Sequence, residues 1–305
     1  MRMKKRFIAI ILGLLVALSI LPIGAILAQE QAGPEVLQIG IFADLHAHDT
    51  DSPGEGKVMT NYRERLQTFV DAMNAWPADL VIELGDLVNG KFVLGAELGE
   101  AERIIGILDD AESVYAQFEG PRYYVLGNHE VYDLSKEEFL EHSDAAATYL
   151  SFDAGAYHFV MLDAQYSKTG ADYGHMGWVV QGSIPESELD WLREDLAATD
   201  KPTIVCIHQP LDVDFALLAG GPEVSNNKAV QAVLRDAGVV IAVFQGHSHE
   251  NAYNLIDGIH YVTFQALVDH AEPTPPSWAM VTLDPTAQVI MIEGEGEQAD
   301  WILEY

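Results

Sequence analysis

The stretch VLQIGIFADLH, residues 36–46, predicts a β-strand that ends at two polar side chains, Asp44 and His46. Its Val, Leu, Ile and Phe residues, bounded by an aspartate, are typical of a strand. Four later runs of this kind also end at side chains that can bind a metal: at Asp86, at Asn128 and His129, at His208, and at His247 and His249. Because ligand crevices form at strand ends in open α/β sheets, we expect these five segments to converge on one edge.

Further strand-like runs alternate with helical patterns along the chain. Strands are expected at 79–84, 122–127, 157–163, 202–208, 239–245, 260–264, 278–283 and 289–294. In 61–76 the apolar residues recur at the three-and-four spacing of a helix with one buried face. Helices are also expected at 97–118, 136–147, 185–198 and 227–237. The alternation indicates an α/β fold, and the strands that follow one another after residue 239 indicate hairpins that complete a sheet.

The composition is strongly acidic. The 305 residues include 16 Lys and Arg against 47 Asp and Glu, which gives a formal net charge of −31. Electrostatic repulsion opposes binding to a nucleic-acid polymer or to an anionic lipid surface, so neither class of partner is expected. The single cysteine, Cys206, excludes an internal disulfide and a cysteine zinc finger, and we expect it to be buried within a strand. A surface adapted to salt or to low pH explains the acidity better than calcium binding, since no D-x-D-x-D-G loop occurs.

The N-terminus has the pattern of an export signal. Four basic residues lie in the first six positions, and an apolar run follows from Phe7 to Ala28. The run is long enough to span a bilayer, and Ile26 fits poorly before a cut after Ala28. Residues 1–28 are therefore expected to be either a cleaved signal peptide or a retained anchor, the protein's one contact with a membrane. One domain at 34–305 would then work outside the cytoplasmic membrane, whereas an N-terminal helix of a cytosolic domain is the alternative.

The residue types at the five strand ends point to metal chemistry. Residues two apart, as in Asp44-x-His46 and His247-x-His249, can direct two ligands at neighbouring ions. Glycine directly before Asp86, Asn128 and His247 allows a sharp turn where an ion approaches closely. Carboxylate and amide oxygens mixed with imidazole suit Mn, Fe or Zn. Each segment alone is a weak signal, since a lone histidine after a strand is commonly structural, but the ordered set of five is specific.

This ordered set resembles the calcineurin-like metallophosphoesterase superfamily, from about residue 36 to about residue 294. The resemblance implies a four-layer α/β-β/α sandwich with two divalent metal ions at the strand ends. It also implies a ligand set for each ion: Asp44, His46, Asp86 and His249 for one, and Asp86, Asn128, His208 and His247 for the other. Asp86 would bridge the two ions, and His129 would protonate the leaving oxygen or donate to the phosphoryl oxygens.

Three segments carry a narrower resemblance, at 126–142, 157–167 and 183–196. They are similar to the manganese-dependent ADP-ribose/CDP-alcohol diphosphatases and their bacterial relatives, although that group commonly has glutamine where this chain has His46. The implied function is an exported dinuclear hydrolase of phosphoanhydride or phosphodiester bonds in small nucleotide-like substrates, with manganese favoured over iron or zinc. The alternatives are a phosphomonoesterase, a cyclic-nucleotide phosphodiesterase, and a non-catalytic binding or sensor protein. Every expected ligand position is filled, which argues against the last.

Two further features are candidates for roles around the metals. The loop at 164–183 is dense in aromatic and histidine side chains, which either contact a base or sugar of the substrate or cover a sheet edge. Its candidate contacts are Tyr166, Tyr173, His175 and Trp178. Glu130 either holds the His129 imidazole in orientation or is an ordinary exposed acid.

Overall fold

The computed structural model describes residues 36–52, 56–90, 100–175, 181–213, 224–270 and 275–305. The chain divides into two units, Met1–Ala32 and Gly33–Tyr305, and every helix and strand described below belongs to the second. The expected export segment at 1–28 lies outside the described residues. Within the described ranges, no helix is both long and apolar enough to cross a membrane.

Six strands form the first sheet, in the order β14-β13-β12-β1-β3-β4. Their bounds are Leu37–Phe42 for β1, Leu80–Glu83 for β3, Arg122–Tyr124 for β4, Trp278–Asp284 for β12, Val289–Glu295 for β13 and Trp301–Glu304 for β14. β1, β3 and β4 are parallel, and β12 to β14 extend the sheet as antiparallel hairpins. The carboxyl ends of β1, β3 and β4 therefore lie at one edge.

The second sheet also has six strands, in the order β5-β6-β7-β8-β10-β9. Their bounds are Leu150–Ala154 for β5, Tyr157–Met161 for β6, Thr203–Ile207 for β7, Val240–Gln245 for β8, Ala252–Ile256 for β9 and Ile259–Thr263 for β10. The four inner strands are parallel, and the edge strands β5 and β9 are antiparallel to their neighbours. A separate two-stranded pair joins β2, Lys57–Val58, to β11, Asp269–His270.

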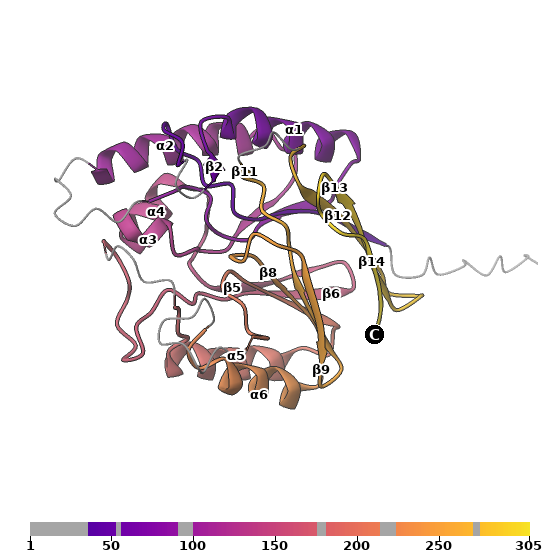
Figure 1. Cartoon of the computed structure of the whole chain (residues 1–305). Helices are drawn as coiled ribbons and strands as arrows, with labels where there is room; N and C mark the ends of the chain where they lie inside the picture. The colour runs from indigo at the N-terminus through magenta and orange to yellow at the C-terminus, as the bar shows by residue number, and fades with distance from the viewer. Residues whose placement is uncertain (1–35, 53–55, 91–99, 176–180, 214–223, 271–274) are drawn as a thin grey trace, which may run out of the picture. The chain divides into compact units, whose positions relative to one another are not determined.

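Helices cover the outer face of each sheet, and the two inner faces pack on each other. The helices are α1 Tyr62–Ala75, α2 Glu100–Tyr115, α3 Glu130–Asp133, α4 Lys136–His142, α5 Glu186–Ala198 and α6 Asn227–Ala237. Figure 1 shows α1 and α2 along one side of the sheets and α5 and α6 along the other. Separate hydrophobic clusters fill the three interfaces between these four layers. The predicted four-layer α/β-β/α sandwich is confirmed.

The alternation of side chains along β1 shows how the layers form. Ile39 and Ile41 belong to the core between the sheets, whereas Phe42 packs with the helical layer. Gly40 lets α1 approach closely, because a Cβ atom there would lie 2.2 Å from the Met73 sulfur. Cys206, as expected, is fully buried in the core between the sheets.

Some elements differ from their predicted extents. The helix expected at 136–147 ends at His142, because Ser143 is extended and its hydroxyl donates to the Phe139 carbonyl. The edge strands β5, β9 and β14 are missing from the sequence prediction, since edge strands are partly exposed and lack a long apolar run. The prediction that strands follow one another after residue 239 is confirmed.

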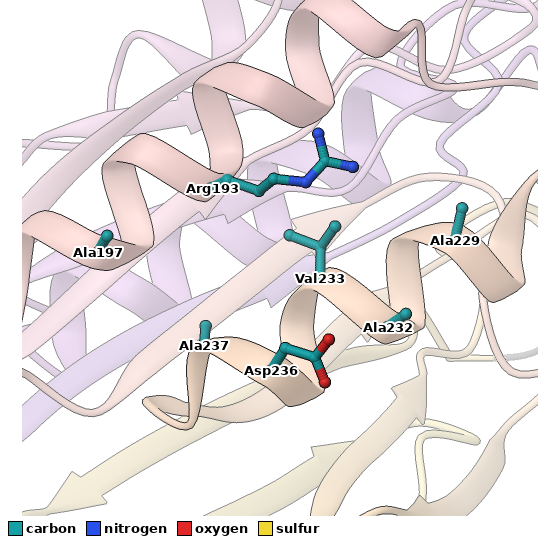
Figure 2. Close-up of a pocket in the computed structure, with 7 residues that line it drawn as sticks. All are labelled: Arg193, Ala197, Ala229, Ala232, Val233, Asp236 and Ala237. Carbon is teal, nitrogen blue, oxygen red and sulfur yellow. The ribbon is translucent and has the colours of Figure 1, made fainter.

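A groove lies between α5 and α6 on the outer face of the second sheet. Its lining, shown in Figure 2, comprises Arg193, Ala197, Ala229, Ala232, Val233, Asp236 and Ala237. None of these residues is a predicted site residue, so this groove does not mark the predicted metal site.

Candidate metal centre

The structure brings the seven predicted metal ligands together at the carboxyl ends of both sheets. The first sheet supplies four of them: Asp44 and His46 after β1, Asp86 after β3, and Asn128 after β4. The second sheet supplies the other three: His208 after β7, and His247 and His249 after β8. The site therefore depends on the packing of one sheet against the other.

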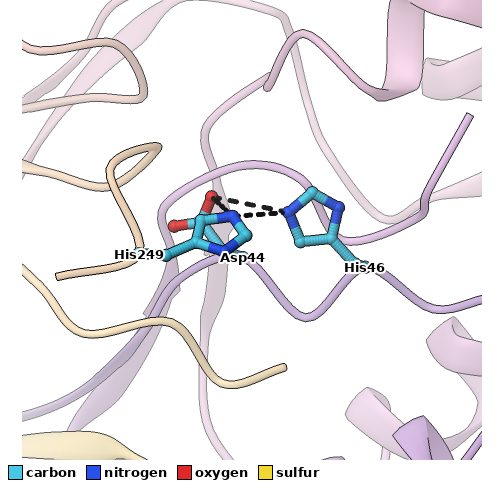
Figure 3. Close-up of side chains that lie close together, drawn as sticks. All are labelled: Asp44, His46 and His249. Carbon is cyan, nitrogen blue, oxygen red and sulfur yellow. Dashed lines mark hydrogen bonds and ion pairs between the residues drawn. The ribbon is translucent and has the colours of Figure 1, made fainter. Parts of the chain in front are cut away.

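One cluster joins Asp44, His46 and His249, which point toward one another in Figure 3. The Nε2 atoms of His46 and His249 are 2.9 Å apart. The Asp44 Oδ1 atom lies 3.4 Å from the His249 Nε2 atom and 3.8 Å from the His46 Nε2 atom. Asp86 completes this set, with its Oδ2 atom 3.7 Å from His46 Nε2.

A second cluster shares the Asp86 carboxylate. The Asp86 Oδ2 atom lies 3.1 Å from the His208 Nε2 atom. That same nitrogen is 3.2 Å from the Asn128 Oδ1 atom and 3.1 Å from the His247 Nδ1 atom. Asp86 is thus common to both clusters, in the place that the sequence resemblance implies for a bridging ligand.

The donor atoms in these clusters fit a pair of cations. The Nδ1 atom of His208 donates to the Leu84 carbonyl, and that of His46 donates to the Asn89 side-chain oxygen. In a neutral imidazole the Nε2 atom then carries a lone pair, so in both rings this lone pair faces carboxylate oxygens. Such a convergence of acceptors requires positive charge at its centre.

The pKa values of His208 and Asp86 are shifted by the charges that lie close together in the second cluster. Burial lowers the pKa of His208, but the Asp86 carboxylate, together with Asp44 and the hydrogen bond to the Leu84 carbonyl, raises this pKa to about 9. Burial acts to raise the pKa of Asp86, yet the imidazoles of His208 and His129 hold it well below its usual range.

Five of the seven ligand residues have left-handed backbone conformations. The φ angles are 54° at Asp44, 49° at His46, 60° at Asp86, 70° at His247 and 60° at His249. Such angles are uncommon outside glycine and cost on the order of 1–3 kcal/mol each. Their concentration at these residues indicates that backbone strain is tolerated here because it orients the predicted ligand side chains.

The glycine before each of three ligands makes room for a ligand from another segment. A Cβ atom at Gly85 would lie 2.4 Å from His208 Nδ1, one at Gly127 would lie 2.2 Å from Asp86 Oδ1, and one at Gly246 would lie 2.8 Å from Asp44 Oδ2. These glycines therefore allow close packing of the ligand segments on each other, which adds to the turning role that the sequence predicts.

We expect Gly85→Ala to lower kcat/KM by about 10²-fold or more, because the new methyl group must displace the His208 ring. Gly238→Ala is the matched control: Gly238 has a φ of 70°, similar to the 98° of Gly85, but a Cβ atom there meets nothing within 4 Å. The control should lose about 1 kcal/mol of stability from backbone strain and keep its bound metal. Equal metal content and activity in the two variants would contradict this account of Gly85.

His129 lies against the metal ligands. Its backbone N–H donates to the Asp86 Oδ1 atom at 2.8 Å, and its ring Nδ1 donates to the Gly90 carbonyl at 3.1 Å. The ring packs edge-to-face on His46, and ligand-type atoms of His46, Asp86 and His129 all lie within 4.8 Å of one another. The His129 ring is therefore within reach of a group bound beside His46 and Asp86.

Glu130 has neither of the roles expected for it. The side chain is buried, and its carboxylate accepts the backbone N–H groups of Gly127, Asp86 and Val88. It therefore ties two ligand segments together through their backbones and does not hold the His129 ring. Burial, followed by repulsion from Asp86, raises the pKa of Glu130 to about 8.

The sequence analysis missed Asn89, whose side-chain oxygen orients the His46 ring. The only signal in the sequence was a polar residue three positions after Asp86.

The candidate substrate contacts that the structure describes lie in three different environments. Tyr166 is half-buried, with the Lys136 ammonium 3.2 Å from its ring centroid. Tyr173 is buried in the core of the α1–α2 layer, so its ring has no exposed face. His175 is exposed and pairs with Glu138. Trp178 lies outside the described residues.

Comparisons with known proteins place the chain among phosphoesterases. Residues 37–251 match the profile of the calcineurin-like phosphoesterase family. A manganese-dependent ADP-ribose/CDP-alcohol diphosphatase from Oryza sativa subsp. japonica is 23% identical, over 87% of this chain and 93% of that protein. A probable cyclic nucleotide phosphodiesterase from Psychrobacter arcticus is 22% identical, over 73% of this chain and 76% of that protein. The crystal structure of a dimetal phosphatase from Danio rerio superposes with a TM-score of 0.72 at 18% identity, over 89% of this chain and 99% of that one.

Proposed function

The chain belongs to the calcineurin-like phosphoesterase family, and from this premise we propose that it is a manganese-dependent hydrolase of phosphoanhydride or phosphodiester bonds in small nucleotide-like molecules. The observation that carries the proposal is the pair of ligand clusters joined at Asp86. Every expected ligand position is filled, which argues against a non-catalytic sensor. The name of the diphosphatase from Oryza sativa subsp. japonica supports both the metal and the class of bond.

The residues present fit two divalent ions: Asp44, His46, Asp86 and His249 would hold one, and Asp86, Asn128, His208 and His247 would hold the other. When bound, such ions polarise a phosphoryl group and lower the pKa of an attacking water. The chain itself orients these ligands through backbone and amide contacts. His129 is placed to donate a proton or a hydrogen bond to the departing oxygen.

A cyclic-nucleotide phosphodiesterase is the second candidate. His46 weighs against the diphosphatase, because that group commonly has glutamine at that position, and it leaves other phosphoesterase activities open. The similarity to the Psychrobacter arcticus protein points the same way. A phosphomonoesterase is the third possibility, since the two clusters alone do not select the leaving group.

The test is a substrate panel with manganese-reconstituted protein. We expect kcat/KM to be highest for ADP-ribose or a CDP-alcohol, lower for 2′,3′-cyclic AMP, and lowest for a simple monoester. A monoester that exceeds the others by more than about tenfold, or about 1.4 kcal/mol of transition-state stabilisation, would overturn the diphosphatase proposal. If kcat/KM is instead highest for 2′,3′-cyclic AMP, the result supports a cyclic-nucleotide phosphodiesterase.

We also propose that the domain works outside the cytoplasmic membrane. The basic hexapeptide and the apolar run from Phe7 to Ala28 support export. Fractionation of native cells should recover the protein outside the cytoplasm, and the mass of the mature chain distinguishes cleavage near Ala28 from a retained anchor. A mainly cytosolic pool would overturn this proposal.

A further inference from the structure

Two buried glutamines connect the sheets beside the metal centre. Gln165 follows β6 and Gln209 follows β7, and both side chains are fully buried. Their amides pair reciprocally: Gln165 Nε2 donates to Gln209 Oε1 at 2.8 Å, and Gln209 Nε2 donates to Gln165 Oε1 at 3.1 Å. Gln165 Nε2 also donates to the Leu126 carbonyl, at 3.0 Å.

The chain of hydrogen bonds from Gln209 through Gln165 to Leu126 begins and ends next to two predicted metal ligands. Gln209 is the residue after His208, in the second sheet, and Leu126 lies two residues before Asn128, in the first sheet. The Asn128 Oδ1 and His208 Nε2 atoms are themselves only 3.2 Å apart. The bond from Gln165 to the Leu126 carbonyl therefore crosses the same gap between the sheets that these two ligands must close, and the amide pair links that bond to the residue next to His208.

A hydrogen bond also fixes the backbone of Gln165. Its N–H donates to the Asp163 Oδ1 atom at 2.7 Å, and Asp163 in turn pairs with the Lys136 ammonium at 2.7 Å. The Asp163 backbone N–H donates to the carboxylate of buried Glu188, on α5. Because the Gln165 amide donates to both Leu126 and Gln209 and accepts from Gln209, these bonds together favour one arrangement of its buried side chain.

We propose that Gln165 and Gln209 are positioning residues that set the separation of Asn128 and His208 and thereby the affinity of the metal site these two ligands share. This inference rests on the proposed function. Partners of this kind typically change metal affinity or activity 10–100-fold when they are removed, without touching the metal themselves. The two amides contribute differently, because Gln165 reaches the Leu126 carbonyl and Gln209 does not.

The test compares three substitutions by methionine, which keeps the side-chain length but cannot donate. Gln165→Met removes the amide pair and the bond to Leu126, and Gln209→Met removes only the pair. Gln298→Met is the control, since Gln298 is buried and bonds to Gln265 and Ala299, neither of which is a proposed ligand. Manganese titration by calorimetry, with the exchange-coupled EPR signal of the ion pair, reports on each site, and thermal unfolding reports on stability.

We expect Gln165→Met to weaken one of the two manganese sites about 10–100-fold and Gln209→Met to weaken the same site less. Excess manganese should restore most of the activity, and Gln298→Met should lower only the unfolding temperature. Wild-type binding of both ions by Gln165→Met and Gln209→Met, with stability losses like that of the control, would overturn the inference. If Gln165→Met does not fold, the manganese affinity of Gln209→Met tests the inference. A wild-type protein that binds fewer than two ions would instead overturn the proposed function.

Discussion

The Asp86→Asn variant is expected to lose about 10³–10⁴-fold in kcat/KM, or about 4–5.5 kcal/mol of transition-state stabilisation. Asp86 is the one residue whose carboxylate lies in both clusters, 3.1 Å from His208 Nε2 and 3.7 Å from His46 Nε2. Asparagine has nearly the same shape, so packing is retained. It removes the negative charge that two cations would share and replaces one acceptor oxygen with a donor. Activity and metal content, measured together under saturating manganese, check this prediction.

Two alanine variants provide the comparison. His249→Ala should chiefly deplete the ion held with Asp44 and His46, and His208→Ala the ion held with Asn128 and His247, because each histidine belongs to one cluster only. Both variants should retain about one metal ion per chain, while Asp86→Asn retains less than either. An Asp86→Asn protein with two ions and near wild-type turnover would show that Asp86 does not bridge.

The metal centre could be predicted from sequence because its ligands follow the strands directly. Asp44, Asp86, Asn128, His208 and His247 each come within a few residues of a strand end. Parallel strands bring their carboxyl ends to one edge, so neighbours in space follow from the order of the elements alone. The residues that follow each strand were therefore enough to predict which side chains come together.

The supporting residues could not be predicted in this way. Glu130 bonds to the backbone of Asp86, 44 residues away, and Gln165 pairs with Gln209, also 44 residues away. Nothing adjacent to either residue in the chain signals these partners, since they are set by how loops from neighbouring strands of one sheet pack on each other. The place of Tyr173 in the core of a helical layer could not be predicted either, because the aromatic-rich loop allowed both contact with the substrate and cover of a sheet edge.

The second large effect is expected for His129→Ala, with the loss depending on the leaving group. Turnover of substrates with poor leaving groups should fall about 10²–10⁴-fold, the usual contribution of a positioned proton donor. An activated aryl phosphate should lose much less, because its leaving group departs without a proton. Measuring kcat for both substrates on the same preparation gives the ratio directly.

The geometry allows a second role for His129, and the same variant separates the two. The His129 ring donates through Nδ1 to the Gly90 carbonyl, and the ring lies beside His46 and Asp86. A proton donor at that position should leave both metal ions bound when it is removed, whereas a ligand should release one. His129→Ala with two bound ions and a loss confined to poor leaving groups supports the proton donor. Equal losses on both substrates with full metal content would make His129 a residue that positions the phosphoryl group, and loss of an ion would add it to the ligands.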